Sequence, residues 1–100
     1  MNTKRFDWYQ AKASSNYVKH GVTFDQRMTA INDELMIDWI DERNSDDEER
    51  VNALGRCNGK VLHVTYAERG DTIWIISTRK ATPNERNDYF RQNFERWHGR

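Results

Sequence analysis

The chain has 100 residues, which is enough for one hydrophobic core, so residues 1–100 are predicted to form a single domain. Apolar residues make up 36% of the sequence, charged residues 32% and aromatic residues 12%, a composition that excludes an intrinsically disordered chain. The formal net charge of zero argues against a nucleic-acid-binding protein that depends on bulk positive charge.

The sequence contains no signal for a membrane or for a disulfide framework. The N-terminus MNTKRFDWYQ lacks the apolar core of a signal peptide, and no run approaches the roughly 20 apolar residues of a membrane span. The single cysteine, Cys57, has no internal partner, which fits a reducing compartment. We therefore predict a cytoplasmic protein without membrane contact.

The first third of the chain is predicted to form two helices. Residues 10–20 contain neither Gly nor Pro, and Gly21 follows where a helix commonly ends in a left-handed turn. Thr23 then offers an N-cap with Gln26 in the reciprocal position, which predicts a second helix over residues 24–31. Apolar residues at helical spacing give this helix its expected buried face: Phe24, Met28 and Ile31.

The middle of the chain is predicted to form an antiparallel meander. Alternating apolar residues predict a short strand in LMIDWID (35–41), and the acidic run DERNSDDEE (41–49) is predicted to be a solvated loop. The strands RVNALGRC (50–57) and KVLHVTYAE (60–68) flank Asn58-Gly59, a dipeptide that favours a tight hairpin turn. After a second turn at ERGD, TIWIISTR (72–79) is apolar on both faces and is predicted to be a central strand.

A last helix over residues 83–98 is predicted from its start signals. Thr82 is a ready N-cap, Pro83 suits the first helical position, and Glu85 completes a capping box. The expected buried stripe of this helix is Tyr89, Phe90, Phe94 and Trp97. The predicted fold is therefore α+β, a small antiparallel sheet with two N-terminal helices and a C-terminal helix packed on it.

The charges are distributed unevenly along the chain. Acidic residues dominate the segment 33–49, opposed there only by Arg43, and arginines concentrate in the last third. This distribution predicts an acidic side and a basic side. The acidic side either attracts a basic partner or simply keeps a small domain in solution.

The residue types favour a chemistry without metals or cofactors. Cys57 stands alone, and the three histidines, His20, His63 and His98, are not spaced as pairs on one helix or strand. No Gly-rich loop between a strand and a helix suggests nucleotide binding. The remaining His, Lys, Arg and Glu side chains suit RNA cleavage, which needs a base for the ribose 2′-OH, cations for the phosphorane and an acid for the departing 5′-oxygen. The same residue types can also serve only to bind phosphate.

Each candidate residue has a structural alternative. His20, directly before Gly21, either complements the helix dipole or belongs to a site, and Lys12 and Lys19 share one helix face that is either solvated or functional. Arg79 at the end of a strand either grips a phosphate or pairs with a carboxylate on the surface. Trp8 is either a core residue or a stacking platform.

Taken together, these stretches resemble the BrnT family of type II toxins, which belongs to the RelE-like ribonucleases. FDWYQAKASSNYVKHGVTFDQ resembles the opening of the family's sequences, and EER at 48–50 resembles its E-x-R before the second strand. ERGDTIWIISTRKATPNERNDY resembles its closing segment. The positions that carry the resemblance are Phe6, Trp8, Lys12, Asn16, Lys19, His20, Gly21, Val22, Phe24, Glu48, Arg50, Ile75, Ile76, Ser77, Arg79, Ala81, Glu85, Arg86 and Tyr89.

The resemblance implies an endoribonuclease that cleaves RNA, mRNA in the first place, and so arrests translation. It also implies a BrnA-like antitoxin with a DNA-binding domain, so that operator DNA is bound only through the complex. From residue type and family position together, the candidate catalytic residues are His20 and Lys19 for proton transfer or charge stabilisation, Arg79 and Arg69 for the phosphate, Glu49 or Glu68 as a base, and Tyr89 as support from the last helix. The implied substrate contacts are Lys12, Trp8, Trp74 and Arg50.

The chain departs from the family pattern at Trp74, where the family usually has Arg before Ile-Ile-Ser, and at Tyr9, where it usually has Asp. Trp74 either removes a phosphate contact or replaces it by stacking on a base. The alternative reading is a catalytically weakened or inactive binding module that acts only through its partner protein.

Overall fold

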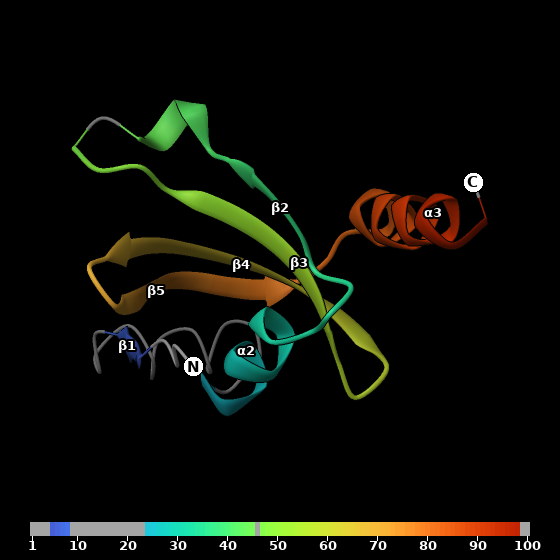
Figure 1. The fold of residues 1–100 in the computed structure, drawn as a ribbon, viewed down its shortest axis with the longest axis horizontal. Coiled ribbons are helices and arrows are strands. Elements are labelled where there is room, and N and C mark those ends of the chain that lie inside the picture. Colours follow the sequence, from blue (N-terminus) through green and yellow to red (C-terminus); the bar gives the residue numbers. More distant parts are fainter. Residues whose placement is uncertain (1–4, 9–23, 46, 99–100) are drawn as a thin grey trace.

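The computed structural model describes residues 5–8, 24–45 and 47–98 (Figure 1). The elements in chain order are β1 (Arg5–Trp8), α2 (Phe24–Ile31), β2 (Ile37–Ile40), the 3₁₀ turn η1 (Glu42–Asn44), β3 (Val51–Cys57), β4 (Lys60–Arg69), β5 (Thr72–Lys80) and α3 (Pro83–His98). The strands form one five-stranded sheet in the order β1-β5-β4-β3-β2. The α+β class is confirmed.

One detail of the prediction is corrected. Strand β1 was not predicted, and it pairs with β5 in parallel, so the sheet is mixed rather than purely antiparallel. The partner of β1 lies more than sixty positions along the chain, so a four-residue stretch carries little local signal of its pairing. The described part of the chain has two α-helices, α2 and α3; the helix predicted at residues 10–20 falls outside the described residues and stays a prediction.

The predicted hairpin turn at Asn58-Gly59 and the predicted capping box of α3 are confirmed. Asn58 and Gly59 both have positive φ, 51° and 78°, as a two-residue hairpin turn requires. The capping box of α3 is formed, with Glu85 N donating to Thr82 Oγ1 at 3.2 Å and Thr82 N donating to Glu85 Oε1 at 2.9 Å. The helix at 24–31 and the meander β3-β4-β5 lie where they were predicted.

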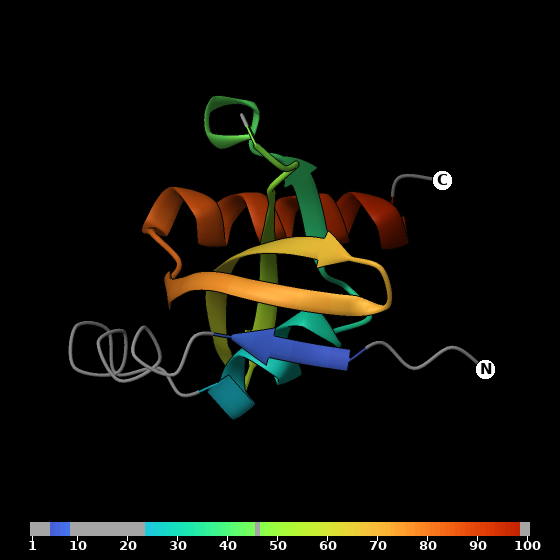
Figure 2. The same cartoon turned by 90° about the vertical axis from the view of Figure 1, so that its left-hand side faces the viewer.

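The sheet has a core on each face, because successive residues of a strand point to opposite sides. Ala53 of β3 belongs to the larger core, which α2 covers with Ala30 and Ile31. Its neighbour Leu54 belongs to a smaller core with Tyr89 of α3. The two helices therefore pack on opposite sides of the sheet (Figure 2).

The predicted apolar stripe of α3 is wrong in part. Tyr89 is buried, but Phe90 is 42% and Phe94 62% exposed. Four positions after Tyr89, the buried place is taken by Asn93, whose amide donates to the carbonyls of Leu35 and Tyr89 at 3.0 and 2.9 Å. A polar residue thus continues the buried face of α3 beyond the small core, and the side chain of Trp97 lies outside the described residues.

Candidate active site

A polar cluster forms where β4, β5 and α3 meet. His63 of β4 and Arg79 of β5 are direct partners across the two strands. Glu85, in the first turn of α3, binds Arg79 through both carboxylate oxygens, with Nη1–Oε1 at 2.7 Å and Nη2–Oε2 at 2.9 Å. The His63 Nε2 lies 3.9 Å from Glu85 Oε2. The cluster brings an arginine, a carboxylate and an imidazole together at one end of the sheet.

The start of α3 holds Glu85 in this position. Its carboxylate accepts the backbone N–H of Thr82 as part of the capping box and binds Arg79 at the same time. Arg79 comes from the end of β5, only six positions earlier. One short connection between a strand and a helix therefore sets the geometry of the ion pair.

The three groups shift one another's protonation. The hydrogen bonds from Arg79, with help from the Thr82 N–H and nearby positive charge, lower the pKa of Glu85 to about 2. The same pairing raises the pKa of Arg79. Burial, and next the positive charge of Arg79, lower the pKa of His63 below its ordinary value of 6.5. Near neutral pH the cluster therefore contains an arginine cation, a carboxylate anion and a neutral imidazole.

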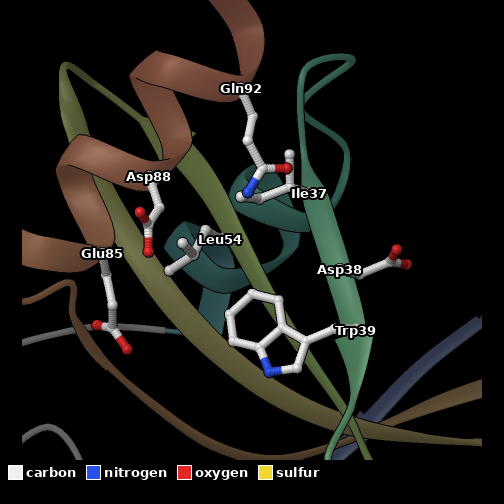
Figure 3. A pocket seen from close by; sticks show the side chains of 7 residues that line it. All are labelled: Ile37, Asp38, Trp39, Leu54, Glu85, Asp88 and Gln92. Atoms are coloured by element: carbon white, nitrogen blue, oxygen red, sulfur yellow. The ribbon is translucent and has the colours of Figure 1, made fainter.

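A pocket of about 480 Å³ opens beside this cluster, between β2 and α3 (Figure 3). Its apolar wall consists of Ile37, Trp39 and Leu54. Its polar residues are Asp38, Glu85, Asp88 and Gln92. The Trp39 ring meets the His63 ring edge-on at 6.0 Å between centroids, and Glu85 belongs both to the pocket lining and to the cluster, so the two lie side by side.

A second group of predicted residues lies at the other end of β4 and β5. Arg69 binds Glu48 with Nε–Oε2 at 3.0 Å and Nη2–Oε1 at 2.6 Å, and its guanidinium lies 4.7 Å from the Trp74 ring centroid. Arg69 pairs with Thr72 across the strands, whereas Arg79 pairs with His63. At about 3.3 Å per residue, the seven steps along β5 separate the two arginines by roughly 23 Å. The structure does not bring Arg69 and Arg79 together.

The other predicted site residues are dispersed. Glu68 is exposed near the end of β4, and Glu49 is exposed just before β3. Arg50 is half-buried, and its backbone N–H donates to Ser45 Oγ at 3.0 Å. Trp8 packs against the larger core from β1. The acidic run predicted as a solvated loop contains the turn η1 and also Glu48, which pairs with Arg69.

Tyr89 lies in the smaller core of the sheet. It is 1% exposed, and its hydroxyl donates to the carboxylate of Asp33. Lys12, Lys19 and His20 fall outside the described residues, so their place relative to the cluster stays a prediction. The predictions missed His63 and Trp39 and assigned Glu85 no catalytic role. A polar ring inside the apolar strand KVLHVTYAE was the one signal for His63.

The described part of the chain has neither a metal-binding cluster nor a membrane-spanning helix. No group of three or more His, Cys, Asp or Glu side chains within it is arranged to hold a metal ion. None of its helices is both long and apolar enough to cross a membrane.

Comparison with known proteins gives a family. No curated protein matches the chain by sequence. A family model described as the ribonuclease toxin BrnT of type II toxin–antitoxin systems matches residues 8–85. This range includes His63, Arg79 and Glu85. Because the match covers well over half of the chain, the protein belongs to the BrnT family of ribonuclease toxins.

Proposed function

We propose that this protein is a metal-independent endoribonuclease that cleaves RNA, mRNA in the first place, at the His63–Arg79–Glu85 cluster. Family membership supports a ribonuclease toxin. The observation that carries the placement is the ion pair of Arg79 and Glu85 beside a neutral imidazole and an open pocket. The reaction is attack of the ribose 2′-oxygen on the adjacent phosphorus.

Arg79 supplies the cation for the phosphate. A guanidinium presents two parallel N–H groups, which match two phosphate oxygens as well as they match a carboxylate. The side chain of Arg79 is 38% exposed, so a phosphate can approach it from solvent. Glu85 holds the guanidinium in a fixed orientation until the phosphate competes for it. The cation then stabilises the charge that develops on the phosphorane.

His63 accepts the proton of the 2′-OH. Its lowered pKa keeps the imidazole neutral near pH 7, as a general base requires. The new bond joins the 2′-oxygen to phosphorus, and the bond from phosphorus to the 5′-oxygen breaks. His20 or Lys19, which the sequence proposes for proton transfer, donates the proton to the departing 5′-oxygen. The products are a 2′,3′-cyclic phosphate and a 5′-hydroxyl end.

The toxin acts in the cytoplasm and is neutralised by a BrnA-like antitoxin with a DNA-binding domain. Operator DNA is bound only through the antitoxin in the complex. The acidic segment 33–49 includes exposed Glu34, Asp38, Glu42, Asp47 and Glu49, which attract a basic partner. Such attraction weakens as salt screens the charges, so the rate of association should fall with ionic strength.

Expression of the chain alone tests the ribonuclease. We expect growth arrest and new RNA ends carrying 5′-hydroxyls, with activity of the purified protein unchanged by EDTA. Arg79→Ala should reduce cleavage about 10²–10³-fold, as loss of a group that stabilises the transition state typically does. Lys80→Ala removes an exposed charge from the neighbouring position and is the matched control. His20→Ala in the same assay tests the residue outside the described range.

The alternative is a binding module without activity. Both strand-end arginines, Arg69 and Arg79, are held by carboxylates, and Trp74 stands where the family usually has Arg. Normal growth and intact RNA from folded wild-type protein would overturn the ribonuclease and favour this alternative. Arrest that is lost in Arg69→Ala but kept in Arg79→Ala would move the site to the other end of β5.

A further inference from the structure

We propose that the pocket between β2 and α3 binds a guanine base of the RNA next to the scissile phosphate, with Asp88 as the residue that selects it. The inference rests on the proposed ribonuclease function and names its substrate preference. The volume of about 480 Å³ leaves room for a nucleobase (Figure 3).

Trp39 provides the stacking surface. Its side chain turns into the space between β2 and α3, and the residue is 42% exposed (Figure 3). Ile37 and Leu54 line the apolar wall beside it. Aromatic rings bind nucleobases face to face with little regard to sequence. Stacking on Trp39 therefore explains binding of a base but not the choice among the four.

Asp88 and Gln92 provide the polar edge. They are four positions apart on α3, hence neighbours on one helix face, and both side chains extend toward the pocket (Figure 3). A carboxylate accepts two parallel N–H bonds. Guanine offers such a pair at N1 and N2, with an acceptor, O6, beside them that suits the Gln92 amide. Adenine and cytosine place an acceptor next to their amino group, and uracil has one N–H between two carbonyls.

The charges around the pocket favour a neutral base over a cationic side chain of a protein. The Glu85 carboxylate is already bound by Arg79, and Asp88 Oδ1 is bound by Arg91 Nη2 at 2.8 Å. The carboxyl group of Asp38 turns away from the pocket (Figure 3) and accepts a hydrogen bond from the Tyr66 hydroxyl at 3.4 Å. Both inward carboxylates thus have an arginine partner that offsets their charge, and Asp88 Oδ1, which has a second lone pair, can still accept an N–H group of a base.

The pocket also lies next to the proposed catalytic cluster of His63, Arg79 and Glu85. Glu85 belongs to its lining and to the ion pair with Arg79, and the Trp39 ring lies 6.0 Å from the His63 ring. A nucleotide whose base stacks on Trp39 therefore has its 3′-phosphate close to Arg79 and His63. Recognition of the base and positioning of the scissile bond become one event.

Binding of the four nucleoside 3′-monophosphates to the purified full chain tests the proposal. We expect 3′-GMP to bind at least tenfold more tightly than the other three, measured by titration calorimetry. Asp88→Asn, which replaces an acceptor oxygen by an N–H₂ donor, should abolish this preference. The Asp88 side chain is 50% exposed, so the variant should fold. Asp71→Asn, in the exposed turn between β4 and β5, is the charge-matched control and should keep the preference.

Mapping of RNA ends gives the second readout. Wild-type cleavage should be enriched next to guanosine, and Asp88→Asn should cleave without that enrichment. Cleavage with no base preference, or a preference that Asp88→Asn leaves intact, would overturn the guanine pocket and leave the ribonuclease standing. Selective binding of 3′-GMP by a protein that does not cleave RNA would overturn the ribonuclease and leave the guanine pocket standing. Binding of the peptide Gly-Arg-Gly in place of 3′-GMP, lost in Asp88→Asn, would overturn the pocket as a base site and indicate a protein-docking site.

Discussion

The hydroxyl of Tyr89 in α3 donates a hydrogen bond to the carboxylate of Asp33, which follows α2. The same carboxylate accepts the backbone N–H groups of Leu35 at 3.0 Å and Arg56 at 2.8 Å. Burial would raise the pKa of Asp33, but these three hydrogen bonds and the charge of Arg56 outweigh it and lower the pKa. One side chain thus connects the segment after α2, strand β3 and helix α3.

Replacing Tyr89 by Phe should therefore reduce stability rather than chemistry. Loss of a hydrogen bond to a charged group costs about 1.5–3 kcal/mol, and we expect Tyr89→Phe to lower the free energy of unfolding in urea by about that amount. RNA cleavage by the folded variant should be close to wild type, because the hydroxyl is bonded to Asp33 and neither residue lines the pocket. A variant of unchanged stability with lost cleavage would instead give Tyr89 the role at the site proposed for it from the sequence.

Acid should weaken the connection between β5 and α3. The pKa of Glu85 is lowered from 4.5 to about 2 in the folded protein, so folding favours its ionised form. The stability this provides is fully present above pH 4.5 and is lost as the pH falls toward 2. Glu85→Gln should therefore flatten the dependence of unfolding free energy on pH in this window. Asp71→Asn is the control, and an equal flattening by both variants would contradict the assignment.

Gly55 marks the close approach of α2 to the sheet. A Cβ at this position would lie 1.9 Å from the carbonyl oxygen of Ala30, so the helix would have to move. We expect Gly55→Ala to lower the unfolding free energy by about 1–3 kcal/mol or more, as overpacking does. Gly70→Ala is the matched control: its φ is +58° but nothing lies near the added atom, so only backbone strain of about 1–2 kcal/mol applies. A smaller cost for Gly55→Ala than for Gly70→Ala would contradict this packing.

The pH dependence of cleavage should report His63. A general base must be unprotonated, and the pKa of His63 is lowered below 6.5 by burial and by Arg79. The acid limb of the cleavage rate should therefore have its midpoint below pH 6.5. His63→Gln should lower the rate about 10²–10⁴-fold and remove this acid limb. An unchanged profile in His63→Gln would assign the base elsewhere, with His20 as the first alternative.

The pairing register of β4 and β5 could not be predicted from the sequence. Starting at the turn, the two strands pair residue by residue without a shift from Arg69–Thr72 to Tyr66–Ile75. A bulge then leaves Ile76 without a partner in the register, so His63 faces Arg79 and not Thr78. Since one residue of slip moves a side chain to the other face of a sheet, the bulge places Arg79 on the face of His63. The sequence TIWIISTR contains no local signal for this bulge.

The sequence by itself determined the features that depend on neighbouring residues. The Asn58-Gly59 turn, the Thr82–Glu85 capping box, helix α2 and the meander all follow from local backbone preferences and hydrogen bonds, and the family follows from motifs along the chain. Only the tertiary structure decided the pairing of β1 with β5, the burial of Asn93 in place of Phe94, and the meeting of His63, Arg79 and Glu85 beside Trp39. These depend on register and on packing between distant segments, which residue types along one chain do not encode locally.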